Sequence, residues 1–377
     1  MSRLYNIALL SAVALTASTL STLSTAQIYA STGHDYLLQT VVQGLEHPWS
    51  MAFLPSGNIL VTERPGRLRL VVDGALQPEP VRGLPDVTAE GQGGLLDLAL
   101  HPNFEDNGWL YFTYSHATED GGLSTHLARG QFKESTASLS GVEQLFIATP
   151  GMRGGRHFGG RLVIDNDHYV YLTVGDRGTM QNAQNLTNHA GTTIRLHDDG
   201  RVPDDNPFVN EDDALDEIFT WGNRNGQGMV IHPETGAVWQ HEHGPRGGDE
   251  INLIQSGLNY GWPEVTHGVN YNGRPITEHS SLPGVEDPLL HWTPSIAPSG
   301  MAIYTGDLFP QWTGDVFVGA LVGQRIQRVR FDGTEVVEQE DLLVDFNTRI
   351  RDVRDGPDGT LWLLTDEPKG RMMRFVR

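Results

Sequence analysis

SMAFLPSGNILVTERPGRLRLV, residues 50–71, and VRDGPDGTLWLLTDEPKGRMMRFV, residues 353–376, share one pattern although they lie near opposite ends of the chain. Each contains Pro-x-Gly, an apolar strand, Thr-Glu or Thr-Asp, a turn rich in proline and glycine, and a second strand. A strand-turn-strand unit that recurs within one chain indicates an internal repeat.

Four weaker copies of this unit occur between the first two. They are GLLDLALHPNFEDNGWLYFTYS (94–115), GGRLVIDNDHYVYLTVGD (159–176), GMVIHPETGAVWQHEHG (228–244) and SGMAIYTGDLFPQWTGDVFVGAL (299–321). A solenoid would need more uniform and often helical repeats, whereas irregular strand-turn-strand copies favour a radial array of four-stranded sheets. The sequence therefore predicts an all-β, six-bladed β-propeller, formed as a single domain over residues 35–377. The loops of such a ring bring distant residues together at its central channel.

The composition agrees with many short strands and limits the choice of partners. The chain has 377 residues with 44 glycines and 21 prolines, which favours strands joined by tight turns over long helices. Its formal net charge is -21, and Lys133 and Lys369 are its lysines. This charge opposes binding to nucleic acid and is typical of an acidic, solvated surface.

The N-terminus MSRLYNIALLSAVALTASTLSTLSTAQIYA has the outline of a secretory signal peptide. One early arginine, Arg3, precedes an apolar run and then small residues, and the run is too short for a membrane span. We expect cleavage after Ala26 or Ala30, and a periplasmic or secreted protein. The chain has no cysteine, which excludes disulfides, Cys-based zinc sites and Cys nucleophiles.

Neither the P-loop nor the Rossmann fingerprint occurs, nor does G-x-S-x-G, so polar clusters between strands carry the candidate chemistry. In AEGQGGLLDLALHP (89–102), Gln92 lies among glycines, where its carboxamide could face a ligand or form a polar turn. In RGGRHFGGRLVID (153–165), His157 precedes a strand, and Asp176 ends the next one. A hairpin would bring this pair together as a general base and its support, although a loop histidine can also be merely exposed.

Two further loops carry arginines and amides. WGNRNGQGMVIHP (221–233) contains Arg224, Asn225 and Gln227, which suit a planar ligand with carbonyl or carboxylate oxygens or could be turn residues. In NTRIRDVRDGPDG (347–359), Arg349 and Arg351 fall on one face of a strand. If that face meets the channel, the two arginines could clamp an anion; if not, they are surface charge.

Two segments suggest metals. HDDGRVPDDNPFVNEDDALDE (197–217) lacks the pattern of an EF-hand and is interpreted as a solvated loop. HEHGPRGGDEINLI (241–254) places two histidines and several carboxylates around a Gly-Pro turn and looks like a metal site.

These motifs, in this order, resemble the soluble PQQ-dependent aldose sugar (glucose) dehydrogenase family and its sorbosone dehydrogenase-like relatives. The resemblance begins at GLEHPWSMAFLPSGNILVTER near residue 44 and runs to the C-terminus through WGNRNGQG, HEHGPRGGDEINLI, GLNYGWPEV and RIRDVRDGPDG. It implies a six-bladed propeller, in agreement with the repeat count.

The resemblance also implies roles for individual residues. His157 would take the proton of the sugar C1 hydroxyl as hydride passes to PQQ, Asp176 would support His157, and Arg224 would stabilise charge on the quinone. Further cofactor contacts would come from Gln92, Asn225, Gln227, Ser295, Arg349 and Arg351. An active-site Ca²⁺ would take the main-chain oxygens of Gly244 and Pro245, and a second, structural Ca²⁺ would take the Glu250 carboxylate and the Tyr260 main-chain oxygen. His241 and His243 would then be bystanders.

The chain departs from the family pattern at three positions. Val322 stands where family members commonly have a lysine, so Arg325 is a candidate to supply that positive contact. Arg156 precedes the base where some glucose dehydrogenases have an acid, and Ser295 replaces a threonine.

The sequence therefore predicts a PQQ- and Ca²⁺-dependent enzyme that oxidises aldoses at C1 to lactones and passes electrons to an unidentified acceptor. The expected protein has no membrane span and is a monomer or homodimer. The rival interpretations are a Ca²⁺-dependent propeller lactonase, which has little use for the arginine pair, and a non-enzymatic NHL-like binding propeller, in which the His-Asp pair would be incidental.

Overall fold

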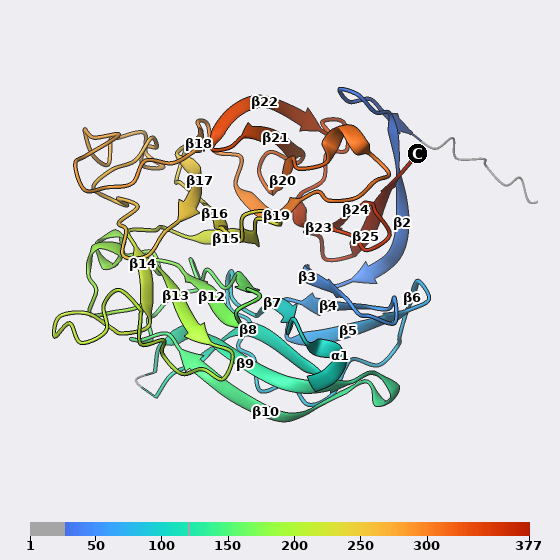
Figure 1. Cartoon of the computed structure of the whole chain (residues 1–377), viewed down its shortest axis with the longest axis horizontal. Helices are drawn as coiled ribbons and strands as arrows, with labels where there is room; N and C mark the ends of the chain where they lie inside the picture. The colour runs from blue at the N-terminus through green and yellow to red at the C-terminus, as the bar shows by residue number, and fades with distance from the viewer. Residues whose placement is uncertain (1–26, 120) are drawn as a thin grey trace, which may run out of the picture.

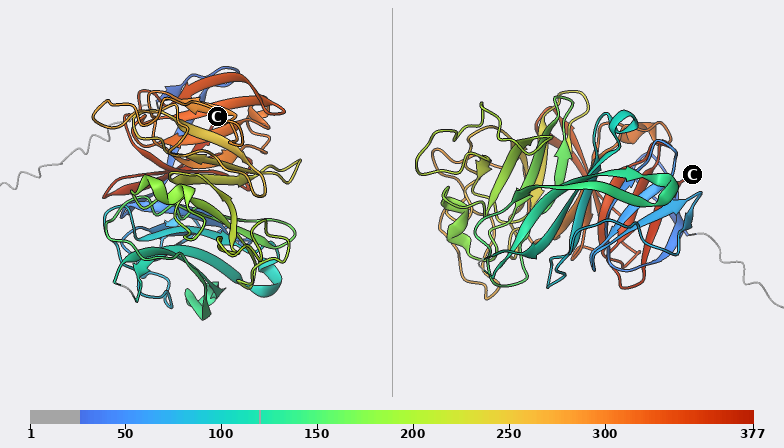
Figure 2. Two further views of the ribbon diagram at one scale, coloured as in Figure 1. Left: turned by 90° about the vertical axis from the view of Figure 1, so that its left-hand side faces the viewer. Right: turned by 90° about the horizontal axis from the view of Figure 1, so that it is seen from below.

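The computed structural model describes residues 27–119 and 121–377, which form six antiparallel sheets arranged in a ring (Figure 1). The side views in Figure 2 show the strands of the sheets running across the thickness of this ring. The structure confirms the predicted six-bladed β-propeller. The predicted signal peptide falls on residues 1–26, outside the described residues.

Each sheet contributes its first strand to the wall of the central channel. These inner strands are β3 (Pro48–Phe53), β7 (Leu95–Leu100), β11 (Leu162–Ile164), β15 (Gly226–Ile231), β19 (Pro298–Ile303) and β23 (Ile350–Asp355). Each inner strand contacts its neighbours in this order, and β23 contacts β3, so the ring is closed.

The remaining strands follow outward by antiparallel pairing. The second strands are β4 (Ile59–Glu63), β8 (Trp109–Ala117), β12 (Tyr169–Val174), β16 (Val238–Glu242), β20 (Val316–Ala320) and β24 (Leu361–Thr365). The third strands are β5 (Arg67–Val72), β9 (Leu123–Lys133), β13 (Thr192–His197), β17 (Asp249–Ile254), β21 (Ile326–Asp332) and β25 (Gly370–Val376). The outer strands are β6 (Ala75–Leu76), β10 (Ser138–Ile147), β14 (Ile218–Trp221), β18 (Leu290–Trp292), β22 (Glu335–Leu342) and β2 (Tyr36–Leu45). The short helices are α1 (Phe104–Asn107), η1 (Glu134–Thr136), η2 (Met180–Gln184) and η3 (Pro310–Trp312).

The sixth blade is built from both ends of the chain. β2 pairs antiparallel with β25, with Leu37 opposite Val376 and Leu45 opposite Gly370, and β1 (Ile28–Tyr29) extends the same sheet. The ring is thus closed by hydrogen bonds between the first and last parts of the described chain.

The six sequence repeats overlap the inner and second strands of the six blades, and the copies at 50–71 and 353–376 also overlap the third strands β5 and β25. Their apolar residues pack between neighbouring sheets; Leu60 of the first blade and Leu98 and Phe112 of the second belong to one buried cluster. Burial of each such side chain contributes about 1.5–3 kcal/mol. This packing between sheets explains why apolar residues dominate the inner strands.

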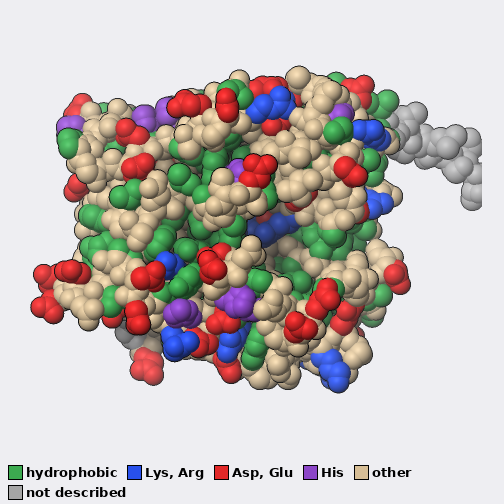
Figure 3. Space-filling model, in the orientation of Figure 1, with side chains coloured by type: hydrophobic (Ala, Val, Ile, Leu, Met, Phe, Trp, Pro, Cys, Tyr) green, Lys and Arg blue, Asp and Glu red, His purple; other side chains and the backbone are tan. Residues whose placement is uncertain are grey.

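The two ends of the channel differ in chemistry. The turns between inner and second strands surround an opening of about 390 Å³ that is lined mainly by apolar residues of all six inner strands. The centre of the face in Figure 3 is hollowed, with hydrophobic side chains around it. Polar residues gather at the opposite end, where inner strands begin and second strands end. Within the described residues, no helix is long and apolar enough to cross a bilayer.

Candidate active site

The predicted site residues lie at the polar end of the channel because they occupy the start of an inner strand or the end of a second strand in the repeat. Gln92, Arg224 and Arg349 each precede an inner strand, and Asp176 and Asp366 each follow a second strand. Antiparallel pairing places the start of one strand beside the end of the next. Loops of several blades therefore meet at this end.

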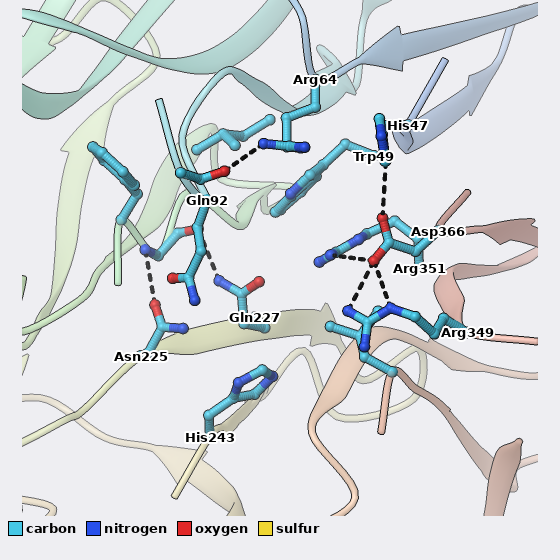
Figure 4. A pocket seen from close by; sticks show the side chains of 15 residues that line it. His47, Trp49, Arg64, Gln92, Asn225, Gln227, His243, Arg349, Arg351 and Asp366 are labelled. Atoms are coloured by element: carbon cyan, nitrogen blue, oxygen red, sulfur yellow. Dashed lines mark hydrogen bonds and ion pairs between the residues drawn. The ribbon is translucent and has the colours of Figure 1, made fainter. Parts of the chain in front are cut away.

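One cavity at this end, the arginine cavity, has a volume of about 230 Å³ and is shown in Figure 4. Its wall combines guanidinium, carboxamide and aromatic groups. The lining side chains and glycines are His47, Trp49, Arg64, Gly91, Gln92, Leu96, Phe158, Gly159, Asn225, Gln227, His243, Leu321, Arg349, Arg351 and Asp366.

Arg349 and Arg351 point into the arginine cavity together, held by one carboxylate (Figure 4). Asp366 Oδ2 accepts hydrogen bonds from Arg349 Nε at 2.9 Å and Arg351 Nη2 at 3.3 Å, and His47 Nδ1 lies 3.6 Å from Asp366 Oδ1. Burial alone would raise the pKa of Asp366, but the charges of Arg351 and Arg349 outweigh it and lower the pKa to about 2. The carboxylate is therefore ionised and aligns the pair.

The predicted amide residues also reach this cavity. Gln92, Asn225 and Gln227 all line it. Asn225 and Gln227 also hold the main chain of Gly159. Asn225 Oδ1 accepts a hydrogen bond from Gly159 N at 3.1 Å, and Gln227 Nε2 donates one to Gly159 O at 3.1 Å. The loop of Gln92 passes so close to the next loop that a Cβ on Gly91, which has φ +60°, would lie 2.2 Å from Gly155 O. Glycine is required there, as the sequence GQG suggested.

A second cavity, the histidine cavity, has a volume of about 330 Å³ and shares Gln92 with the first. The other lining residues are Arg156, His157, Asp176, Gly178, Met180, Arg224, Pro245, Trp262, Asn270, Tyr271 and Ile276. The structure thus brings His157, Asp176 and Arg224 together.

His157 and Asp176 form the expected pair, with Nδ1 of the histidine 2.6 Å from Oδ1 of the aspartate. Asp176 also accepts from Gly178 N at 2.7 Å and from Trp262 Nε1 at 2.9 Å. The backbone of His157 has φ +52°, an uncommon conformation for a non-glycine residue, and Gln92 Oε1 accepts its N–H at 2.7 Å. Both the ring and the main chain of His157 are therefore fixed.

The electrostatic environment keeps His157 neutral near pH 7. Burial lowers its pKa most, the bond to Asp176 opposes this, and the charges of Arg224 and Arg156 lower the pKa further. Because Asp176 can only accept when ionised, the ring proton lies on Nδ1, which leaves the lone pair of Nε2 free. A neutral imidazole with a free ring nitrogen has the chemistry that a general base requires.

Arg224 is held from two sides. Its main-chain N–H and that of Asn225 donate to the buried carboxylate of Glu242. Its Nη1 donates to His243 O at 3.0 Å and Gly244 O at 3.1 Å, and its Nη2 lies 3.3 Å from Tyr271 Oη. The guanidinium therefore lies at the wall of the histidine cavity, beside the Gly-Pro turn.

Asp249 anchors the predicted calcium loop. Its carboxylate accepts from Gly244 N at 2.8 Å, Ile296 N at 2.7 Å and Ser295 Oγ at 2.9 Å. Ser295 lines neither cavity, so the structure does not place it as the direct cofactor contact that the resemblance implied. Its hydroxyl instead helps to fix Asp249, which in turn holds the peptide of Gly244.

Glu250 and Tyr260 lie in the fourth blade. Glu250 faces Glu242 across the β16–β17 ladder, and both side chains are buried. Burial and the Glu242 carboxylate raise the pKa of Glu250 well above its ordinary value. The Tyr260 hydroxyl donates to Leu253 O at 2.6 Å, so only a main-chain oxygen of this residue is available as a ligand. Within the part of the chain that the structure describes, neither carboxylate forms an ion pair with a basic side chain, and two adjacent buried carboxylates of this kind suit a bound cation.

One other group within the described residues, His101, His168 and Asp198, has ligand atoms within 4.8 Å of one another. His101 Nδ1 accepts from Asn103 N at 3.0 Å and Asn107 Nδ2 at 2.8 Å, so its proton lies on Nε2, facing Asp198. Metal binding needs an unprotonated ring nitrogen. This group therefore does not suit a metal ion.

Several residues of the arginine cavity were missed from the sequence. Arg64 follows β4 and adds a third guanidinium to the wall, whereas the suggested substitute, Arg325, pairs with Asp341 at 3.1 Å and lines neither cavity. His243, expected to be a bystander, lies in the wall and bonds to Pro298 O at 2.5 Å. Arg64, Asp366 and His243 all follow second strands, and this shared place in the repeat is the signal that could have found them.

The chain has close relatives of known structure. It is 43% identical over 333 residues to the aldose sugar dehydrogenase of Escherichia coli K12, covering 88% of this chain and 90% of that protein. The crystal structure of the soluble E. coli aldose sugar dehydrogenase in the apo-form superposes with a TM-score of 0.87 at 41% identity, over 90% and 99% of the two chains. The PQQ-bound aldose sugar dehydrogenase of Streptomyces coelicolor gives a TM-score of 0.74 at 26% identity, over 89% and 96%.

A propeller in which a His-Asp pair and a cavity lined by arginines meet at the polar end of the channel has its candidate active site there. The family model for glucose/sorbosone dehydrogenases matches residues 45–374, nearly the whole described chain, and the chain belongs to that family.

Proposed function

We propose that this chain is a PQQ- and Ca²⁺-dependent dehydrogenase that oxidises the C1 hydroxyl of aldoses to the lactone. The observation that carries the proposal is the neutral His157, fixed by Asp176 at 2.6 Å, in a cavity that adjoins the arginine cavity at Gln92. The names of the E. coli and Streptomyces relatives support the same reaction class.

The arginine cavity fits the chemistry of PQQ, a planar tricarboxylate. Arg64, Arg349 and Arg351 offer guanidinium groups, and one carboxylate, Asp366, offsets part of their charge. Trp49 and the amides of Asn225 and Gln227 add a flat apolar surface and groups that can bond to carbonyl oxygens. When bound, PQQ would accept the hydride from C1, and Ca²⁺ would act as the Lewis acid beside it.

His157 performs the proton transfer in this proposal. Its free Nε2 takes the proton of the C1 hydroxyl as the C1–H bond breaks, so the sugar loses one proton and one hydride and becomes the lactone. Asp176 stabilises the imidazolium that forms, and Trp262 and Gly178 hold Asp176 in place. In this proposal Arg224, which lines the histidine cavity, stabilises negative charge on the acceptor oxygen.

The two calcium sites are proposed on the oxygen donors that the structure offers. Gly244 O and Pro245 O would hold the active-site ion; Gly244 O already accepts from Arg224, but a carbonyl oxygen has a second lone pair. Glu250 and the main-chain oxygen of Tyr260 would hold the structural ion, whose charge would compensate the buried carboxylates.

We also propose that the chain is exported to the periplasm or secreted and that residues 35–377 are one folded unit. The apolar segment before Ala26 supports export, and the pairing of β2 with β25 supports a single unit.

The test is reconstitution. The purified apoprotein is loaded with PQQ and Ca²⁺, and dye reduction is followed with glucose and other aldoses. We expect PQQ binding at micromolar concentration and aldose-dependent dye reduction. If PQQ does not bind and no aldose reduces the dye, the proposal is wrong; hydrolysis of an added lactone would then favour the lactonase interpretation.

A further inference from the structure

Arg156 adds to the histidine cavity a positive charge that is unpaired among the described residues. It lines the cavity next to the base, its side chain is exposed, and its stem lies against Gly178, where an added Cβ would be 2.7 Å from Arg156 Cδ. Among the described residues its guanidinium has neither an ion pair nor a hydrogen bond. A guanidinium in this state retains all its donors for a ligand.

The loop that carries Arg156 is firmly held. Arg177 donates to the main-chain oxygens of Arg156 and, at 2.8 Å, of Gly154, and its guanidinium carbon lies 3.6 Å from the centroid of the Phe158 ring. The Arg156 side chain therefore extends from a fixed main chain, which limits the entropy lost when it binds a ligand.

The other charges of the histidine cavity are already engaged. Asp176 is the one carboxylate among the described residues that line it, and its two oxygens accept from His157, Gly178 and Trp262. Arg224 donates to main-chain oxygens and to Tyr271, while His157 is neutral. The side chains of Arg156, Arg224 and Asp176 together give the cavity wall a net charge of one positive unit. The guanidinium N–H groups of Arg156 are the donors that remain available to a ligand.

This local charge contrasts with the net charge of -21 for the whole chain. At physiological ionic strength the Debye length is about 8 Å, so remote surface acids are largely screened at the cavity. The charges nearest the substrate therefore matter most, and those of the cavity wall favour an anion. The Ca²⁺ proposed at Pro245 would add positive charge, and the proposed PQQ carboxylates would face the arginines of the other cavity.

We propose that the preferred substrates are aldoses that carry an anionic group, a carboxylate or a phosphate, and that Arg156 binds this group. The inference rests on the proposed dehydrogenase function. A guanidinium presents paired donors that match the oxygens of both groups. The sugar C1 would lie at His157 and the anionic group at the neighbouring Arg156. The oxidation itself is unchanged: the proton of the C1 hydroxyl would pass to His157 and the hydride from C1 to PQQ.

The experiment compares sugars that differ only at C6. Glucose, glucuronate and glucose 6-phosphate are supplied to the protein loaded with PQQ and Ca²⁺, and kcat/KM is measured for each. We expect kcat/KM for at least one anionic sugar to exceed that for glucose by about tenfold, the low end for a charge-assisted hydrogen bond. The higher kcat/KM of the anionic sugar should decrease in high salt. Whichever of glucuronate and glucose 6-phosphate has the higher kcat/KM shows whether Arg156 prefers a carboxylate or a phosphate.

Two variants make the comparison specific. Arg156→Gln should lower the ratio of anionic to neutral kcat/KM about tenfold, whereas the control Arg153→Gln, an exposed arginine of the same loop outside both cavities, should keep the wild-type ratio. A wild-type ratio of one or less, or the same ratio in Arg156→Gln as in the wild type, overturns the inference.

A binding measurement separates this inference from the function on which it rests. Isothermal titration of the apoprotein with glucuronate and glucose 6-phosphate should show binding that weakens about tenfold in Arg156→Gln and is kept in Arg153→Gln. If the loaded wild type oxidises none of the sugars, the proposed function fails, and the titration alone then decides the inference. Equal binding by wild type and Arg156→Gln overturns it.

Discussion

Replacement of Asp176 by asparagine tests the proposed base most directly. The bond from His157 Nδ1 to Asp176 Oδ1 is 2.6 Å long and joins a largely covered ring to a fully buried carboxylate. A hydrogen bond to a charged group is worth about 1.5–3 kcal/mol. If that energy is lost mainly in the transition state, where the ring becomes positive, kcat should fall about 10- to 150-fold at 1.36 kcal/mol per tenfold.

The same variant should shift the pH profile in a defined direction. Burial and the charges of Arg224 and Arg156 lower the pKa of His157, and the bond to Asp176 opposes them. Loss of the carboxylate removes the opposing contribution, so the pKa should fall further. Because the base acts in its neutral form, the acid limb of kcat/KM should move to lower pH while the plateau falls.

The assay is dye-linked turnover of the loaded enzyme from pH 4 to pH 9, with PQQ binding as the check on folding. The matched control is Asp198→Asn, which alters a His-Asp pair, His101 to Asp198 at 3.3 Å, outside both cavities. That variant should keep the wild-type profile. Turnover of Asp176→Asn at the wild-type rate, with an unmoved acid limb, would refute the role given to this pair.

Four more outcomes are expected. Arg351→Gln should weaken PQQ binding about 10- to 100-fold in a fluorescence titration, since a paired guanidinium is lost, whereas Arg325→Gln should bind as the wild type does. Asp366→Asn should lower the free energy of unfolding by about 2 kcal/mol at pH 7, because the pKa of Asp366 is about 2 in the folded state and higher in the unfolded state. This stabilisation is present above about pH 4 and is lost as the pH falls toward 2. Urea unfolding at several pH values measures it. A chelator should lower the Tm of the wild type, but should change the Tm of Glu250→Gln much less if Glu250 binds the structural ion. Tyr271→Ala should raise KM for the sugar several-fold with a smaller change in kcat, because this exposed ring forms the rim of the histidine cavity; an unchanged KM would remove Tyr271 from sugar binding.

The fold could be predicted because its repeat is local. Each copy contains a complete strand-turn-strand unit, and six such units specify the number of blades. The His157–Asp176 contact was also predictable, since both residues flank one hairpin. The pairing of β2 with β25 was not, because the outer strand of the last blade lies more than 300 residues from its partner and has no counterpart in the repeated pattern.

The cavity wall was predicted only in part. Motif resemblance pointed to Arg349, Arg351 and Gln227, which lie in the wall, but it also pointed to Ser295, whose hydroxyl bonds to Asp249 instead. Sequence spacing shows which strand end a residue occupies, but it cannot show which neighbouring group satisfies a side chain. Arg64 was overlooked because its place after a second strand shows which end of the channel it occupies, but VTER alone does not show whether its side chain enters a cavity.

The junction between the first and sixth blades divides the arginine cavity. His47, Trp49 and Arg64 come from one side of it, and Arg349, Arg351 and Asp366 from the other, while His47 N donates to Glu367 O at 3.0 Å across the junction. The start of β2 and the end of β25 lie side by side in the sixth blade (Figure 1), at the end of their ladder that is away from His47. The two ends could therefore be joined by a short peptide and the chain reopened in an exposed loop of another blade. Such a circular permutant would keep every wall residue of the arginine cavity while its first and last strands belonged to another blade.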